Sequence, residues 1–164
     1  MDAFGVDHLD IQLEYNTARP FTWSSFDSLN SYTHYNQPLA HPLWANFNEV
    51  AGLIRYQPLP RWLLTGRLIY AQTGENTATE NWGANPLLSN TSRMGDYGHS
   101  TGQGVGATIV LAGLDVSWEL YHNLYLDLRL LLRTKDSTDN TRDLKTQLFS
   151  LGVRMNIWNP RLDF

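Results

Sequence analysis

Apolar residues occupy every second position in several stretches of the chain. The clearest stretch is 124–133, in which leucine alternates with Tyr125, Asp127, Arg129 and Arg133. A period of two indicates a β-strand with two different faces. The same pattern recurs at 6–15, 47–57, 62–70, 107–120 and 148–157. The run 107–120 keeps its alternation through Ala112 and Gly113, so we expect one strand there rather than a hairpin. The pattern therefore predicts about six β-strands.

The connections between these strands alternate between long and short. Long polar segments cover 16–46, 73–102 and 134–142, whereas the turns at 57–60 and 121–123 are tight. Bacterial outer-membrane barrels have long extracellular loops and short periplasmic turns. We therefore predict an all-β fold, an antiparallel up-and-down transmembrane β-barrel segment with both ends in the periplasm. Two aromatic girdles support this prediction: Tyr56, Trp62, Trp118, Tyr121 and Trp158 on the turn side, and Tyr15 and Tyr70 on the loop side.

The composition excludes several other classes of protein. Only 42% of the 164 residues are hydrophobic, and no run of about 18 apolar residues could form a transmembrane helix. A net charge of −4 without a basic stripe argues against nucleic-acid binding. The absence of cysteine removes disulfides and cysteine metal sites.

An outer-membrane protein must be exported, yet residues 1–8 lack the basic and apolar regions of a secretory signal. We therefore expect residues 1–164 to be a single domain that forms the C-terminal portion of a larger barrel, with a signal peptide and further strands upstream.

The charged residues of the strands fall on the face opposite the leucines. This inward set comprises Glu14, Glu49, Arg55, Arg67, Asp115, Glu119, Asp127, Arg129, Arg133 and Arg154. Cross-strand ion pairs in a wet lumen account for such a mixture. No catalytic constellation can be recognised from spacing, so we expect no enzyme activity. His34 and His41 match no standard ligand spacing, and we expect neither a metal nor another cofactor.

The two long loops contain many aromatic residues. We single out five as candidates for surface recognition: Trp23, Tyr32, Tyr35, Trp82 and Tyr97. Such rings could stack on a glycan or anchor a protein partner. The alternative is that they hold the loops together or plug the lumen. The sequence leaves both interpretations open.

Three segments carry a resemblance to a known family. Residues 19–29 read RPFTWSSFDSL, residues 32–43 read YTHYNQPLAHPL, and residues 55–60 read RYQPLP. They resemble the C-terminal half of Bacteroidetes outer-membrane barrels of the capsule-assembly Wzi-like or gliding-motility-associated type. The terminal Phe164 looks like the signal by which outer-membrane barrels are recognised for insertion. The resemblance implies location in the bacterial outer membrane, contact with lipid, and partners among surface polysaccharides or envelope proteins.

Two functional hypotheses follow. The first is a non-enzymatic outer-membrane barrel that supports capsule assembly or attachment, or gliding or secretion machinery. The alternative is a small soluble β-sandwich or ligand-binding barrel in which the leucine faces form a core.

Overall fold

The computed structural model describes residues 2–156, which form one long antiparallel sheet and a loop region. The six strands of the sheet are β1 (Leu9–Ala18), β4 (Phe47–Leu59), β5 (Trp62–Glu75), β6 (Val105–Tyr121), β7 (Leu124–Ser137) and β8 (Leu144–Met155). Each long strand pairs with the next one along the chain. The predicted antiparallel up-and-down arrangement of six strands is confirmed.

Short elements lie outside the main sheet. The first long connection contains a two-stranded ribbon, β2 (Thr33–His34) with β3 (Gln37–Pro38). Three-residue 3₁₀-helices occur at η1 (Ala3–Gly5), η2 (Ser28–Asn30), η3 (Asn90–Ser92) and η4 (Asn140–Arg142). None of the helices between residues 2 and 156 could span a membrane.

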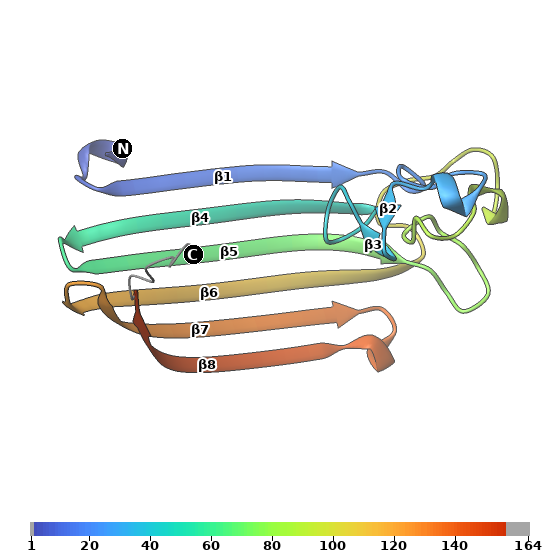
Figure 1. Ribbon diagram of the computed structural model, residues 1–164. Coiled ribbons are helices and arrows are strands. Elements are labelled where there is room, and N and C mark those ends of the chain that lie inside the picture. Colours follow the sequence, from blue (N-terminus) through green and yellow to red (C-terminus); the bar gives the residue numbers. More distant parts are fainter. Residues whose placement is uncertain (1, 157–164) are drawn as a thin grey trace, which may run out of the picture.

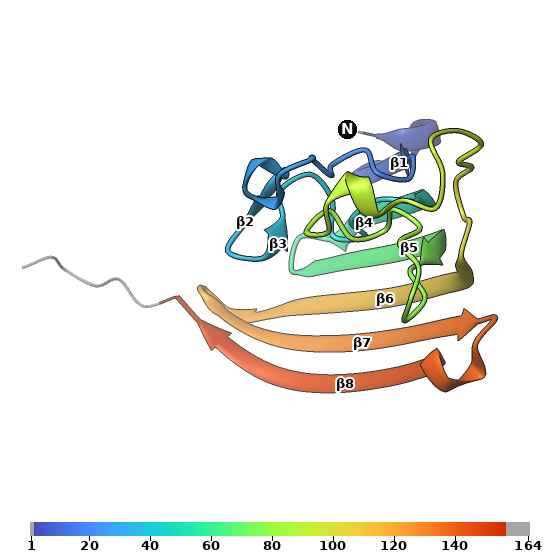
Figure 2. The same ribbon diagram turned by 90° about the vertical axis from the view of Figure 1, so that its right-hand side faces the viewer.

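Long and short connections lie at opposite ends of the sheet (Figure 1). The β1–β4, β5–β6 and β7–β8 connections share one end, which we call the loop end, and the tight β4–β5 and β6–β7 turns share the other. Figure 2 shows that the sheet is curved and that the two long loops lie on its concave side. Within residues 2–156, β1 and β8 are the two edges of the sheet and do not pair with each other, so these strands form an open sheet rather than a closed barrel.

The register of the sheet separates two faces. One row of residues crosses all six strands as Ile11, Ile54, Gly66, Leu114, Leu130 and Phe149, and we call its side the apolar face. The neighbouring row on the opposite side, the charged face, is Asp10, Arg55, Thr65, Asp115, Arg129 and Ser150. The predicted alternation is confirmed, and it continues through Gly113 without a break.

The small core lies on the charged face at the loop end. Its buried apolar residues are Ala18, Ala45, Phe47, Ala71, Ala107 and Ile109. On the apolar face, by contrast, Leu13 is 77% exposed and Val153 is 69% exposed. The soluble alternative requires the leucine faces to form a core. Within the described residues they do not, because the long loops cover the other side of the sheet.

The strands extend further toward the loop end than the apolar alternation predicts. β1 ends at Ala18 rather than Tyr15, β7 ends at Ser137 rather than Arg133, and β8 begins at Leu144 rather than Leu148. At this end polar side chains pair across the strands, and the Thr17 hydroxyl donates to Asn48 Oδ1 at 2.7 Å. The backbone ladder therefore continues after the hydrophobic pattern has ended. The predicted strand residue Ile157, together with Trp158 and Phe164, lies outside the described residues.

The first tight turn is shorter than predicted. We expected residues 57–60 to form the reversal, yet β4 continues to Leu59. Pro58 lies inside the strand at a register shift between Tyr56 and Leu59. Proline has no N–H to donate to a ladder hydrogen bond. It is tolerated at this position because the ladder is interrupted there.

Candidate functional site

A single buried asparagine connects the two long loops, which we define as residues 19–46 and 76–104. Asn46 has no exposed surface. Its side-chain amide donates to the carbonyls of Gly74 at 2.8 Å and Gln103 at 2.9 Å, and its Oδ1 accepts from the Gly102 N–H at 2.7 Å. One side chain therefore joins the end of the first loop to both ends of the second.

The backbone geometry of this junction restricts which residues can occupy positions 46 and 74. Asn46 has a φ of 61°, in the left-handed region that asparagine tolerates better than most residues. A Cβ on Gly74 would lie 2.0 Å from the carbonyl oxygen of Gln103. The close approach of the two loop ends therefore depends on both residues.

Backbone contacts further along the loops make them one unit, which we call the loop cap. The Phe21 N–H donates to the Gly83 carbonyl at 3.0 Å, and the Asn90 N–H donates to the Ser25 carbonyl at 3.0 Å. Gly83 has a φ of 81°, and a Cβ there would lie 2.6 Å from the Phe21 nitrogen. The cap is thus held by hydrogen bonds between the loops as well as at its base.

A cavity of 410 Å³ lies between the loop cap and the charged face. The first loop contributes residues 42–45 and the second contributes Ala84, Asn85 and Leu88. The sheet contributes Ile109 from β6 and two cations from β7, Arg133 and Lys135. This volume falls in the range of small-molecule sites, about 300–1,000 Å³.

The charges beside this cavity are unevenly compensated. Glu75 contacts Lys135 through one carboxylate oxygen and Arg142 through the other, the second contact at 3.2 Å. Arg142 also pairs with Asp139 at 3.2 Å. The hydroxyl and backbone N–H of Thr141 hold the pKa of Asp139 below its ordinary value, and Arg142 adds to this effect. Lys135 and Arg142 are therefore neutralised by two carboxylates.

Arg133 has no such partner. It is half-buried, and no hydrogen-bond or ion-pair partner for its guanidinium occurs among residues 2–156. Across the sheet it faces Leu111 and Thr146. Its neighbours two residues away on the same face of β7 are Leu131 and Lys135. None of these neighbours carries a negative charge, so the cavity has one uncompensated positive charge.

The predicted cross-strand ion pairs are present nearer the middle of the charged face. Asp115 accepts from Arg67 at 3.0 Å and also contacts Arg129. Asp127 accepts from Arg154 at 2.9 Å and from the Ser117 hydroxyl at 2.6 Å.

Other members of the inward set behave differently. Glu14 contacts Gln12, and Glu49 accepts from Asn16 at 3.0 Å. For Glu14, Arg55, Glu119 and Arg133 the expected pairing was wrong, since none of them forms an ion pair within the described part of the chain.

Two of the five predicted recognition residues pack within the cap. The indole of Trp23 donates to the Trp44 carbonyl at 3.1 Å, and its ring centroid lies 5.7 Å from that of Tyr32. The indole of Trp82 donates to Glu80 at 3.2 Å. Both tryptophans are half-buried.

The three tyrosines of that set are exposed. Tyr32 is 54% exposed, Tyr35 is 88% exposed and Tyr97 is 93% exposed. Tyr35 lies at the turn of the β2–β3 ribbon, where it and Asn36 have φ values of 48° and 60°. Two consecutive positive φ values are typical of a type I′ hairpin turn. The structure therefore places the tyrosines on the surface of the cap and the tryptophans within it.

His34 and His41 each contact neighbouring side chains of the loops and strands. His41 Nε2 lies 3.2 Å from Glu49, and the His41 ring stacks on Phe47 with centroids 4.5 Å apart. The ring of His34 contacts Tyr35. No group of three or more His, Cys, Asp or Glu residues placed to hold a metal occurs within residues 2–156.

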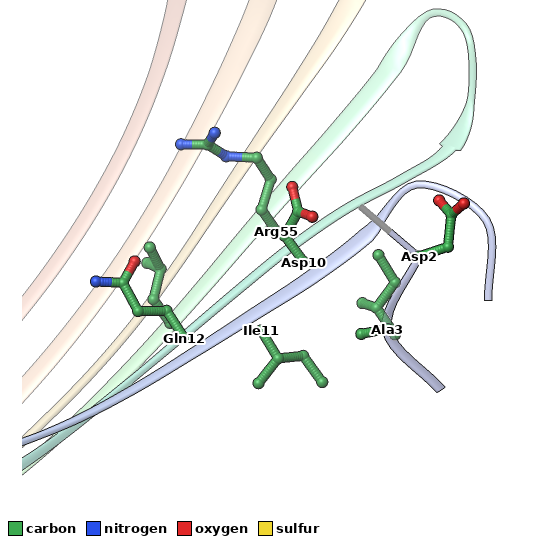
Figure 3. A pocket seen from close by; sticks show the side chains of 8 residues that line it. Asp2, Ala3, Asp10, Ile11, Gln12 and Arg55 are labelled. Carbon is green, nitrogen blue, oxygen red and sulfur yellow. The ribbon is translucent and has the colours of Figure 1, made fainter. Parts of the chain in front are cut away.

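A second, larger cavity lies at the other end of the sheet, beside η1 and β1, with a volume of 640 Å³. Figure 3 shows Arg55 and Asp10 on one side of β1 and Ile11 on the other. This cavity therefore extends around an edge strand that pairs with β4 on one side and with no strand on its other side among the described residues. We regard it as a consequence of the open edge rather than as a ligand site.

Sequence reasoning missed both the Asn46 junction and the basic cavity. Lys135 was expected in a loop because the apolar alternation stops at Arg133. Continuing the period of two by one step would have placed Lys135 beside Arg133 on the charged face. No sequence signal distinguishes Asn46 from the other asparagines of the loops.

Comparison of the chain with protein-family models, curated proteins and solved structures found no match. The resemblance to Bacteroidetes outer-membrane barrels therefore stays a prediction.

Proposed function

We propose that this chain forms part of the wall of a bacterial outer-membrane β-barrel, and that its loop cap supports the assembly or attachment of surface polysaccharide. The observation that carries the proposal is the separation of the two faces. Large apolar side chains remain exposed on one face, from Leu13 on β1 to Val153 on β8, and the ion pairs of Asp115 and Asp127 lie on the other. Lipid around a barrel and water inside it select for this division.

Aromatic residues at the two ends of the apolar face support the same orientation. Trp62 and Trp118 lie at the end with the tight turns, and Tyr15 and Tyr70 lie toward the loop end. Tryptophan and tyrosine are enriched where the hydrocarbon of a bilayer meets its headgroups. The loop cap would then face the cell exterior and the tight turns the periplasm.

The two open edges of the sheet require further strands if the sheet lies in a membrane. In lipid, the free N–H and C=O groups along β1 and β8 would lack hydrogen-bond partners, so only a closed barrel is stable there. We therefore propose that further strands pair with β1 and β8 to complete the barrel. Six strands are fewer than the eight or so of the smallest common bacterial barrels.

The role in surface polysaccharide rests on the family resemblance and on the form of the cap. The exposed tyrosines Tyr32, Tyr35 and Tyr97 offer flat rings of the kind that stack on sugars. A role in gliding or secretion machinery would use the same surface to contact an envelope protein.

Detergent dependence tests the membrane location. The full-length protein should fold only in detergent or lipid, and it should migrate differently in gels with and without heating. In liposomes, added protease should cut the long loops or the tight turns but not the strands. A full-length protein that stays monodisperse in water without detergent would overturn the proposal and favour the soluble alternative.

A further inference from the structure

We propose that the cavity under the loop cap binds a carboxylate-bearing sugar, with Arg133 as the residue that holds the carboxylate. This inference rests on the proposed function and specifies its ligand as an acidic polysaccharide. It starts from the one cation in the cavity that lacks a partner among residues 2–156.

The uncompensated charge of Arg133 requires an explanation. A half-buried guanidinium loses part of its hydration, and burial of a charge is costly unless the charge is paired. The carboxylate that lines the same cavity is engaged elsewhere, since Glu75 pairs with Lys135 and Arg142. On the neighbouring strand β6, Asp115 pairs with Arg67 and Arg129. A bound anion would supply the missing partner.

The charge balance favours an anion with a single negative charge. Around the cavity, the cations of Lys135 and Arg142 are balanced by the carboxylates of Glu75 and Asp139, which leaves Arg133 alone. A guanidinium presents two parallel N–H donors that match the two oxygens of a carboxylate. A carboxylate therefore fits this site better than a phosphate monoester, whose second charge would have no partner.

The rest of the cavity suits a sugar ring. The first loop contributes Leu43 and Trp44, and Ile109 lies in the sheet below. These apolar groups can cover the faces of a pyranose, while the Asn85 side chain and backbone groups of the loops offer hydrogen bonds to hydroxyls. The cavity is large enough for a small ligand at 410 Å³.

The test measures binding of a glucuronic-acid oligosaccharide to the full-length protein by isothermal titration calorimetry, with the matched glucose oligosaccharide as the neutral probe. Wild-type protein should bind the acidic probe more tightly. The Arg133→Gln variant should bind the acidic probe about 10- to 100-fold more weakly, as expected for loss of a hydrogen bond to a charged group. Its binding of the neutral probe should not change, and Arg133→Lys should give intermediate affinity.

Arg129→Gln is the matched control because Arg129 lies on the same strand and face but outside the cavity, and Asp115 keeps Arg67 as a partner. This variant should bind like the wild type, and far-ultraviolet circular dichroism should show that each variant is folded. A folded Arg133→Gln variant with wild-type affinity would overturn the inference, as would equal losses in both variants or no preference for the acidic probe. A sulfated glucose oligosaccharide that binds more tightly than the glucuronate would also overturn the choice of a carboxylate.

This assay is independent of the membrane proposal because it can be performed in detergent or in water. If the protein requires detergent as proposed but does not bind the acidic probe, the ligand inference alone is overturned. Binding by a protein that is monodisperse in water would overturn the membrane location alone.

Discussion

The ring of Trp62 stacks on that of Trp118 across β5 and β6, with centroids 5.2 Å apart and an interplanar angle of 10°. The pair lies at the turn end of the apolar face, where Trp118 is 37% exposed. A double-mutant cycle with Trp62→Leu and Trp118→Leu should give a coupling energy of about 0.5–1.5 kcal/mol in lipid. Unfolding of the full-length barrel measures it, and a coupling near zero would show that the rings only occupy the interface side by side.

The two faces of β7 should respond differently to exchange of charge. Leu128 lies on the apolar face, so Leu128→Arg should cost about 2–4 kcal/mol if that face meets the bilayer centre. Arg129→Leu should cost less, about 1 kcal/mol or below, because Asp115 retains Arg67. Reversible unfolding in lipid gives both values, and equal losses would mean that the faces do not separate lipid from lumen.

Asn46→Ala should loosen the loop cap while leaving the sheet in place. The change leaves the carbonyls of Gly74 and Gln103 and the N–H of Gly102 without the side-chain partner. Each unsatisfied buried group costs about 1–3 kcal/mol. Hydrogen exchange should show faster exchange at residues 19–46 and 76–104 with little change in β7 and β8.

The nearby Asn48→Ala variant provides a control for the Asn46 experiment. Asn48 accepts hydrogen bonds from Thr17 and Tyr15 at the end of the strands and forms none with the second loop among the described residues. The two variants should therefore differ in the second loop. Unchanged protection of that loop in Asn46→Ala would contradict its role as the junction.

The aromatic candidates should separate into two groups. Trp23→Ala removes a hydrogen bond to Trp44 and a contact with Tyr32, so it should increase proteolysis of the first loop. Tyr35→Ala and Tyr97→Ala remove exposed rings and should leave proteolysis unchanged. If the tyrosines take part in recognition, the double variant Tyr35→Ala and Tyr97→Ala should reduce attachment of surface polysaccharide. An inserted double variant with normal attachment would remove them as recognition residues.

The period of two predicted the sheet well because each strand has one strongly apolar side. Alternation identified every long strand and the uninterrupted course of β6 through Gly113. It failed at the loop end, where Lys135 continues β7 but both faces carry polar residues. There the strand is defined by its backbone hydrogen bonds, which the polarity of the side chains does not predict.

The candidate site was harder to predict than the sheet. Arg133 was correctly placed on the charged face, but its lack of a partner depends on the register with Leu111 and Thr146. The cavity depends further on how the loops fold back over the sheet, which is set by contacts between residues as distant in sequence as Asn46 and Gln103. Sequence spacing contains no information about such a contact.

The Asn46 junction also determines where this protein can accept foreign sequence. The bases of both loops are joined there, between the paired strands and the loop tips. The tips are the turn at Tyr35 and Asn36 and the exposed segment around Tyr97 and Gly98, and a change at either tip should not alter the strand pairing. Exposed loop tips are the positions at which proteins tolerate insertions best. A peptide tag inserted at either tip would be displayed without moving β4, β5 or β6, whereas one inserted next to Gly74 or Gln103 would separate the loops from the sheet.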